Sequence, residues 1–186
     1  MEKKFELTDK FVFNTFGIKL FQIKCTKSFK YAKEGDLGGY VEKDENLDQE
    51  SDAWVSGNAR VSGDAWVSGD AQVSGNAQVS GNARVYGDAR VSGNAWVSGD
   101  AWVYGNADIE NDNNHCGFDC FGSCNRHTHA YLTKDNKVEI TCGCFCGSIE
   151  EFEKKVEKTH SGTIYEKQYK AIINVIKIKF GLNDLI

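Results

Sequence analysis

The sequence of 186 residues contains no proline and a single methionine. It has no apolar run that approaches the roughly 20 residues needed to span a bilayer. Its first residues, Met1-Glu2-Lys3-Lys4-Phe5-Glu6, also lack the apolar stretch of a signal peptide. We therefore expect a cytoplasmic protein.

The sequence has fewer basic than acidic residues. Its 22 Lys and Arg residues stand against 27 Asp and Glu residues, which gives a net charge of −5. Nucleic acids and anionic membranes attract proteins through a basic surface. We expect no membrane binding and no general nucleic-acid binding, although a local basic patch stays compatible with this composition.

The cysteine content does not fit a simple disulfide scaffold. Seven cysteines is an odd number, and the segment Cys142-Gly-Cys-Phe-Cys146 spaces three of them too tightly for local bridges. We interpret them as reduced thiols in a reducing compartment, with a disulfide scaffold as the alternative.

The dominant feature is a repeat of six residues that runs from Asp52 to about Asn111, of the type Asp-Ala-Trp-Val-Ser-Gly. Such a fixed period is typical of a parallel β-helix. Ala and Val stand two residues apart, so on a short strand both point inward while the residue between them points outward. The Gly-Asn and Gly-Asp pairs then mark the corners, because these residues tolerate positive φ.

A single hexad cannot fold alone. Burying one Val contributes about 1.5–3 kcal/mol, whereas ordering six residues costs about 6–12 kcal/mol. The motif resembles the repeat of left-handed β-helices, which implies three hexads per coil and open ends that need covering. Three outward rows follow from this coil, with a flattened coil of two hexads as the alternative: Trp54, Gln72, Arg90, Asp108; Arg60, Gln78, Trp96; and Trp66, Arg84, Trp102.

The third row is the most aromatic. It places Arg84 between Trp66 and Trp102, and Tyr86 and Tyr104 fall on the same side. Contiguous aromatic surface of this extent marks an interface, so we predict a homo-oligomer, a trimer or a dimer, or a partner at this face. Ladders of stacked rings on an open surface are the alternative.

The flanking segments predict two further domains. Residues 1–51, with a strand at Lys19–Cys25, are interpreted as a small N-terminal β cap, and residues 52–111 as the solenoid. Residues 112–186 are interpreted as an α+β domain. Within it we expect a loop over 112–126, a hairpin around Asp135-Asn136, a helix from a capping box at Ser148 to about Lys158, and a second helix over 165–180.

Cysteine and histidine gather between residues 116 and 146. Cys116, Cys120, Cys124, His127, His129 and the three later cysteines could supply a tetrahedral zinc site. Their spacing is not a standard one, so we predict neither a metal nor another cofactor. Catalysis by a Cys beside a His has no particular pair in its favour, and we assign no catalytic residue.

Several segments together resemble the hexapeptide-repeat proteins encoded by phages and prophages. They are Gly35-Asp-Leu-Gly-Gly-Tyr-Val-Glu42, Phe121-Gly-Ser-Cys-Asn-Arg126 with Thr128 and Tyr131, Cys142-Gly-Cys-Phe145, Gly147, Glu151-Phe152 and Thr159-His160. Members of that family do not share Cys116, Cys120, Cys124 or Cys146, which weakens the zinc interpretation. Left-handed β-helix enzymes, acyltransferases among them, place His on their coils, whereas these hexads contain none.

The resemblance implies a non-enzymatic phage accessory protein in the host cytoplasm. Such a protein could act against host defence by sequestering a signalling nucleotide. Arg offers a bidentate fork for phosphate, so the residues expected to bind an anionic ligand are Ser123, Asn125, Arg126, Thr128, Tyr131, Gly143 and Cys144. The alternatives are that these residues only pin the C-terminal domain, that a host defence protein binds the aromatic face, or that the chain is an acyltransferase.

Overall fold

The computed structural model describes residues 3–182, which form two compact units that divide between Asp112 and Asn113. The first unit is built of β-strands, and the second combines strands with two helices.

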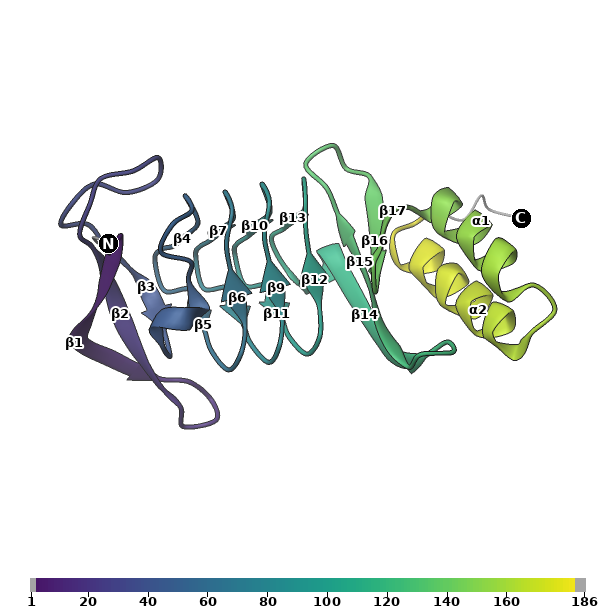
Figure 1. Cartoon of the computed structure of the whole chain (residues 1–186), viewed down its shortest axis with the longest axis horizontal. Helices are drawn as coiled ribbons and strands as arrows, with labels where there is room; N and C mark the ends of the chain where they lie inside the picture. The colour runs from purple at the N-terminus through teal and green to yellow at the C-terminus, as the bar shows by residue number, and fades with distance from the viewer. Residues whose placement is uncertain (1–2, 183–186) are drawn as a thin grey trace. The chain divides into compact units, whose positions relative to one another are not determined.

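The hexads form a parallel β-solenoid of short strands (Figure 1). Trp54 pairs with Gln72, and Gln72 with Arg90, so that successive coils repeat after 18 residues. This register confirms three hexads per coil and the three predicted rows. The strands are β4 (Trp54–Val55), β5 (Arg60–Val61), β6 (Trp66–Val67), β7 (Gln72–Val73), β8 (Gln78–Val79), β9 (Arg84–Val85), β10 (Arg90–Val91), β11 (Trp96–Val97), β12 (Trp102–Val103) and β13 (Asp108–Ile109).

The core of the coils is as the repeat predicts. Every Ala and Val of the inward positions, from Ala53 to Val103, is buried. Ladder hydrogen bonds between coils hold the backbone, for example from Gln72 N to Ala89 O at 2.9 Å. The stability of the solenoid therefore comes from stacking, because no hexad has a core of its own.

The corners explain the glycine of each hexad. Gly69 has φ +67°, and a β-carbon on it would lie 2.9 Å from the backbone nitrogen of Gly87 in the next coil. Glycine is thus required by conformation and by space. Beside the glycines, Asn58 donates to Asn76 and Asn76 to Asn94, each at 3.2 Å.

Strands β1 (Phe5–Phe13), β2 (Lys19–Cys25) and β3 (Leu37–Val41) precede the coils. They continue one wall of the solenoid, in the order β1-β2-β3-β5-β8-β11, and β2 confirms the predicted strand at Lys19–Cys25. Between β3 and β4, a 3-10 turn over Asp44–Asn46 leads to Leu47, which bridges Val67 on a second wall.

Two buried side chains bind backbone carbonyls in the first coil. Asn46 is fully buried and donates to Gly63 O at 3.0 Å and to Ala65 O at 2.8 Å. The Lys4 ammonium donates to Ser51 O at 2.6 Å and to Ala53 O at 2.9 Å. In later coils such carbonyls accept from backbone N–H groups of the preceding coil. Here the side chains of Asn46 and Lys4 donate the hydrogen bonds instead.

Trp54 was expected on an outer row like the other tryptophans. Its side chain does leave the core, but only 5% of it is exposed, because Phe29 packs edge-to-face on it with ring centroids 5.4 Å apart. The segment between β2 and β3 therefore covers the first tryptophan of the solenoid.

The second unit has an antiparallel sheet in the order β14-β15-β16-β17. Strands β15 (Arg126–Leu132) and β16 (Val138–Cys142) confirm the predicted hairpin around Asp135-Asn136. The prediction of a loop over 112–126 is wrong, since β14 (His115–Phe121) pairs with β15. Strand β17 (Phe145–Ser148) adds a fourth strand that the sequence analysis did not predict.

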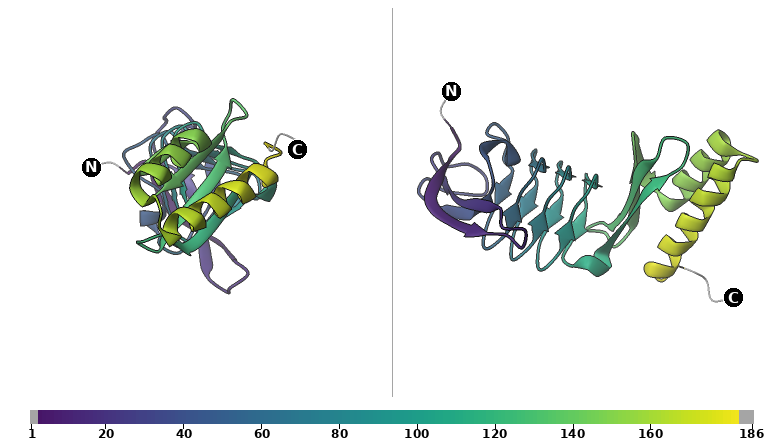
Figure 2. Two further views of the ribbon diagram at one scale, coloured as in Figure 1. Left: turned by 90° about the vertical axis from the view of Figure 1, so that its right-hand side faces the viewer. Right: turned by 90° about the horizontal axis from the view of Figure 1, so that it is seen from below.

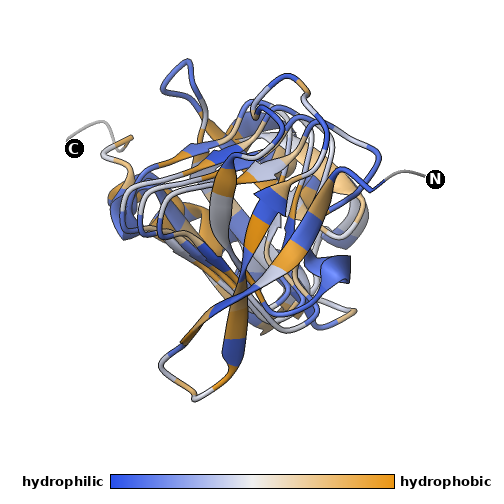
Figure 3. Cartoon of the chain, turned by 90° about the vertical axis from the view of Figure 1, so that its left-hand side faces the viewer, coloured by the Kyte–Doolittle hydropathy of each residue, from blue (hydrophilic) through white to orange (hydrophobic). Residues whose placement is uncertain are grey.

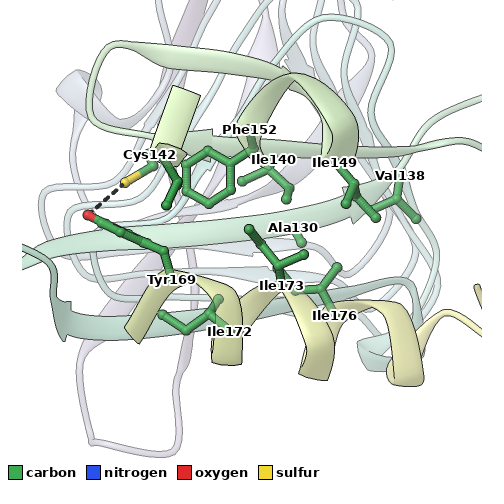
Figure 4. Close-up of a cluster of buried hydrophobic side chains, with 11 residues drawn as sticks. Ala130, Val138, Ile140, Cys142, Ile149, Phe152, Tyr169, Ile172, Ile173 and Ile176 are labelled. Atoms are coloured by element: carbon green, nitrogen blue, oxygen red, sulfur yellow. Dashed lines mark hydrogen bonds between the residues drawn. The ribbon is translucent and has the colours of Figure 1, made fainter. Parts of the chain in front are cut away.

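Both predicted helices are confirmed. Helix α1 (Ile149–His160) begins at the Ser148 capping box, and α2 (Ile164–Lys179) follows the break at Gly162. The two helices lie side by side next to the sheet (Figure 2). Their buried residues meet those of β15 and β16 in one core, drawn in Figure 4: Ala130, Val138, Ile140, Cys142, Ile149, Phe152, Val156, Tyr169, Ile172, Ile173 and Ile176.

Within residues 3–182, no helix has the length and apolar character needed to cross a membrane.

Candidate functional site

A pocket of about 210 Å³ opens in the second unit. It lies where the turn between β14 and β15, the turn between β16 and β17, and both helices meet. Its lining consists of Ser123, Cys124, Arg126, Cys142, Cys144, Phe145, Phe152, Lys155, Val156, Thr159, His160 and Tyr169. Ligand pockets usually measure about 300–1,000 Å³, so this one can enclose a single ring or phosphoryl group of a larger ligand.

Arg126 is placed by the turn between β16 and β17. Cys142 pairs with Phe145, which leaves Gly143 and Cys144 as a two-residue turn, and Gly143 has φ +59°. A β-carbon on Gly143 would lie 2.4 Å from Nη1 of Arg126. The guanidinium group therefore lies directly over Gly143, and a side chain at this position would have to displace it.

Tyr169 is placed by the other turn. Gly122, with φ +73°, donates its N–H to Gln168 Oε1 at 3.0 Å, and a β-carbon on Gly122 would overlap the Tyr169 hydroxyl. The same hydroxyl lies 3.8 Å from Cys142 Sγ (Figure 4). Burial, together with Cys142, raises the pKa of Tyr169 above its usual range, so the phenol stays protonated.

Cys142 is held by a second hydroxyl. Thr128 is fully buried and donates to Cys142 Sγ at 3.3 Å. The thiol thus lies at the inner wall of the pocket between Thr128 and Tyr169.

A chain of aromatic rings forms the apolar wall. Ring centroids are 5.1 Å apart for Phe145 and Phe152, 5.5 Å for Phe152 and Tyr169, and 5.5 Å for His160 and Tyr169. The charged groups among the lining residues are Arg126 and Lys155, and none of the described lining residues is acidic. Aromatic rings beside the two exposed cations Arg126 and Lys155 suit a ligand that carries a ring and an anionic group.

The structure brings together only part of the predicted ligand-binding set. Ser123, Arg126 and Cys144 line the pocket, and Gly143 supports Arg126. Asn125 is exposed in the first turn with φ +49° and does not line the pocket.

The other two predicted ligand-binding residues are buried. Thr128 is covered by Cys142. Tyr131 lies on the other face of β15, with its hydroxyl 4.0 Å from Cys146 Sγ and its ring 5.6 Å from that of His129. Neither belongs to the pocket lining.

No residue of the aromatic wall was predicted for the site, and neither was Lys155. Phe145, Phe152, Thr159 and His160 do occur in the segments that carry the resemblance to phage proteins. That recurrence was the available signal for their role. Lys155 and Tyr169 had no such signal, because they come from helix positions whose contacts depend on the fold.

The other predicted cluster divides between two faces of the sheet. Cys116 packs against the helical core, and burial raises the pKa of its thiol to about 11. His115 and His129 lie on the opposite face, 3.0 Å apart between Nδ1 and Nε2, and His127 pairs with Asp119. Within residues 3–182, no three His, Cys, Asp or Glu side chains are arranged to hold a metal ion.

The aromatic row of the solenoid has the contacts expected from its register. Arg84 lies 5.4 Å from the ring of Trp102, and Tyr86 lies 4.5 Å from Tyr104 between ring centroids. Exposed fractions of 40% for both Trp66 and Tyr104 leave large rings at the surface.

Comparison with known proteins finds a family-model match within the coils. A family model described as the YdcK beta solenoid repeat matches residues 53–69, 77–91 and 89–105. No curated protein matches the chain. About a quarter of the sequence is therefore similar to a known β-solenoid repeat, and this agrees with the stacked coils of the first unit.

Proposed function

We propose that the chain is a non-enzymatic binding protein, and that the pocket of its second unit holds a small anionic ligand. The observation that carries this proposal is the position of Arg126 and Lys155 beside an aromatic wall with no acidic residue in the described lining. A phosphate oxygen would accept from the Arg126 fork, while a ring stacks against Phe145 or Tyr169.

The ligand class that fits is a nucleotide. A pocket of about 210 Å³ would enclose one base or one phosphate and leave the rest of the molecule outside. In the wider proposal this is a signalling nucleotide of host immunity, which a phage-encoded hexapeptide-repeat protein sequesters in the host cytoplasm. The left-handed winding of the coils, the closure of their first end by residues 1–51 and a homo-oligomeric state belong to the same proposal.

The test is ligand binding by the full chain. Isothermal titration with 3′,5′-cyclic AMP, cyclic di-AMP and cyclic di-GMP should find at least one ligand whose binding weakens tenfold or more in Arg126→Ala. Losing a charge-assisted hydrogen bond costs about 1.5–3 kcal/mol. Lys167→Ala, which removes an exposed charge outside the pocket, should bind like the wild type.

Unchanged affinity in Arg126→Ala would exclude the pocket as the site. Native mass spectrometry of protein purified from infected cells extends the search to ligands outside this panel. A bound mass that persists in Arg126→Ala would equally contradict the proposal.

The exposed rings of the third row favour a second candidate, in which a host protein binds the aromatic face. Rings exposed by 40% at Trp66 and Tyr104 resemble the anchors of protein interfaces. In this case, Trp66→Ser should abolish capture of the partner and leave nucleotide binding unchanged. Arg126→Ala and Trp66→Ser therefore distinguish the two candidates, because each variant should lose only one kind of binding.

A further inference from the structure

The hairpin of β1 and β2 ends in a cluster of exposed phenylalanines in the first unit. Phe11, Phe13 and Phe16 are exposed by 46%, 58% and 72%, and they lie within six residues of one another. Figure 3 shows the hairpin extending away from the coils, with hydrophobic positions along it. None of the three rings belongs to the buried core of the described chain.

The turn that carries Phe16 is held in place. Asn14 Oδ1 accepts from the N–H groups of Phe16 and Ile18, each at 2.9 Å, and Asn14 N donates to Ile18 O at 2.9 Å. Gly17 closes the turn with φ +76°. The exposure of Phe16 is thus a product of an ordered turn.

Positive charge accompanies the rings. The Lys19 ammonium lies 4.0 Å from the ring centre of Phe11 and 4.6 Å from that of Phe21, and Lys10 is exposed next to Phe11. Residues 10–33 contain six Lys and no Asp or Glu, although the whole chain has five excess negative charges. Two of the six are ion-paired, Lys24 with Glu6 and Lys30 with Asp70. The net charge that argued against anionic surfaces therefore does not describe this segment.

Exposed rings next to cations combine two attractions to a phospholipid surface. Apolar side chains insert at the level of the headgroups, and Lys side chains bind the anionic phosphates. Phe11 and Phe13 pack edge to face, with centroids 5.6 Å apart, and form a compact apolar wedge. A projecting wedge with flanking lysines fits a bilayer better than it fits a nucleic-acid strand.

We propose that the tip of the β1–β2 hairpin, residues 10–19, binds the surface of anionic membranes. Phe11, Phe13 and Phe16 insert among the headgroups, while Lys10 and Lys19 lie against lipid phosphates. This site is independent of the pocket in the second unit.

The test is co-sedimentation of the full chain with vesicles of phosphatidylcholine alone, and of phosphatidylcholine with about one third phosphatidylglycerol. We expect binding to the anionic vesicles only. Phe11→Ser/Phe13→Ser/Phe16→Ser should weaken it at least tenfold. Lys10→Gln/Lys19→Gln should weaken it about 25-fold, because each lysine near such a surface contributes about a fivefold factor.

The matched control is Trp66→Ser/Trp96→Ser, which removes two exposed rings from the coils of the same unit and should bind like the wild type. Circular dichroism and urea unfolding check that each variant folds. Absence of binding, equal binding to both kinds of vesicle, or equal loss in the control would overturn the proposal. The proposal would also be overturned if the phenylalanine variant still bound anionic vesicles and differed from the wild type only in its oligomeric mass, or only in its binding to single-stranded oligonucleotides.

Discussion

The side chain of Arg126 lies over the α-carbon of Gly143, so that a β-carbon on this glycine would stand 2.4 Å from Nη1. Two consecutive strands thus build one binding group: β15 supplies the cation, and the turn after β16 supplies the space. The backbone conformation of Gly143 therefore affects where Arg126 can lie, and so the proposed binding of an anion.

Gly143→Ala should therefore impair ligand binding without touching the ligand. The added methyl group would displace the guanidinium, and we expect a loss of affinity close to that of Arg126→Ala. The positive φ of this residue adds a stability cost of about 1–2 kcal/mol. Titration with the ligand identified for the wild type measures the first effect, and urea unfolding measures the second.

Gly162→Ala is the control for conformational strain. It has φ +75° in the same unit, but a β-carbon there has nothing within 4 Å. It should lose similar stability and keep its affinity. Equal affinity in Gly143→Ala and Gly162→Ala would show that the position of Arg126 does not depend on the turn.

The coils could be predicted in detail from the sequence, whereas the pocket could not. Each hexad carries its own inward, outward and corner residues, so a local pattern specifies a structure that repeats. The pocket depends on contacts distant in sequence, such as that between Gly122 and Tyr169, which no local pattern encodes. Arg126 and Tyr131 lie five positions apart on β15 and therefore point to opposite faces, which the expected loop over 112–126 did not reveal.

Strand β14 was missed for a related reason. Its sequence His-Cys-Gly-Phe-Asp-Cys-Phe has the composition of a loop, and only its pairing with β15 makes it a strand. Gly117 shows the constraint, because a β-carbon there would lie 2.6 Å from the His127 ring across the pair. The glycine that suggested a loop is the residue that allows close packing between strands.

The first coil should depend on Asn46. Asn46→Ala leaves the buried carbonyl of Ala65 and the partly buried carbonyl of Gly63 without their side-chain donor, at about 1–3 kcal/mol for the first and less for the second. We expect a loss of about 2–4 kcal/mol in the free energy of unfolding, measured in urea. Asn58→Ala, at an exposed corner, should lose less than about 1 kcal/mol; comparable losses would argue against a special role for the first coil.

The seven cysteines should divide by burial. Cys120, Cys124 and Cys144 are exposed, whereas Cys25 and Cys142 are buried. Cys146 is exposed too, but partial burial raises the pKa of its thiol. Since the thiolate is the reactive form, Cys116, with its pKa raised to about 11 by burial, should also resist alkylation. Brief treatment with iodoacetamide at pH 8, followed by peptide mass spectrometry, should label the first three before Cys25, Cys116 and Cys142.

Zinc tests the alternative interpretation of the same residues. If Cys120, Cys124 and Cys144 are ordinary thiols, zinc at a concentration equal to that of the protein should not slow their labelling. Joint protection of Cys124 and Cys144 by zinc would instead show that these residues bind the metal.

Lys4 should make stability depend on pH. Burial lowers the pKa of its ammonium from 10.5 to about 8, although it donates to two carbonyls and lies 5.1 Å from the ring centre of Phe29. Between these values the unfolded chain binds the proton and the folded chain releases it, so stability rises with pH. The expected gain is about 1–2 kcal/mol from pH 8 to pH 10.

Lys4→Met isolates this contribution, because its side chain has a similar length and no proton to release. The difference in unfolding free energy between wild type and variant should grow in favour of the wild type from pH 8 to pH 10. Above pH 9 the raised pKa of Cys116 acts in the opposite direction in both proteins, and above pH 10 that of Tyr169 does too, since the unfolded chain then loses protons that the folded chain keeps. The comparison therefore stops at pH 10. If the unfolding free energies of the two proteins change in parallel between pH 8 and pH 10, the Lys4 ammonium is as well solvated in the folded state as in the unfolded chain.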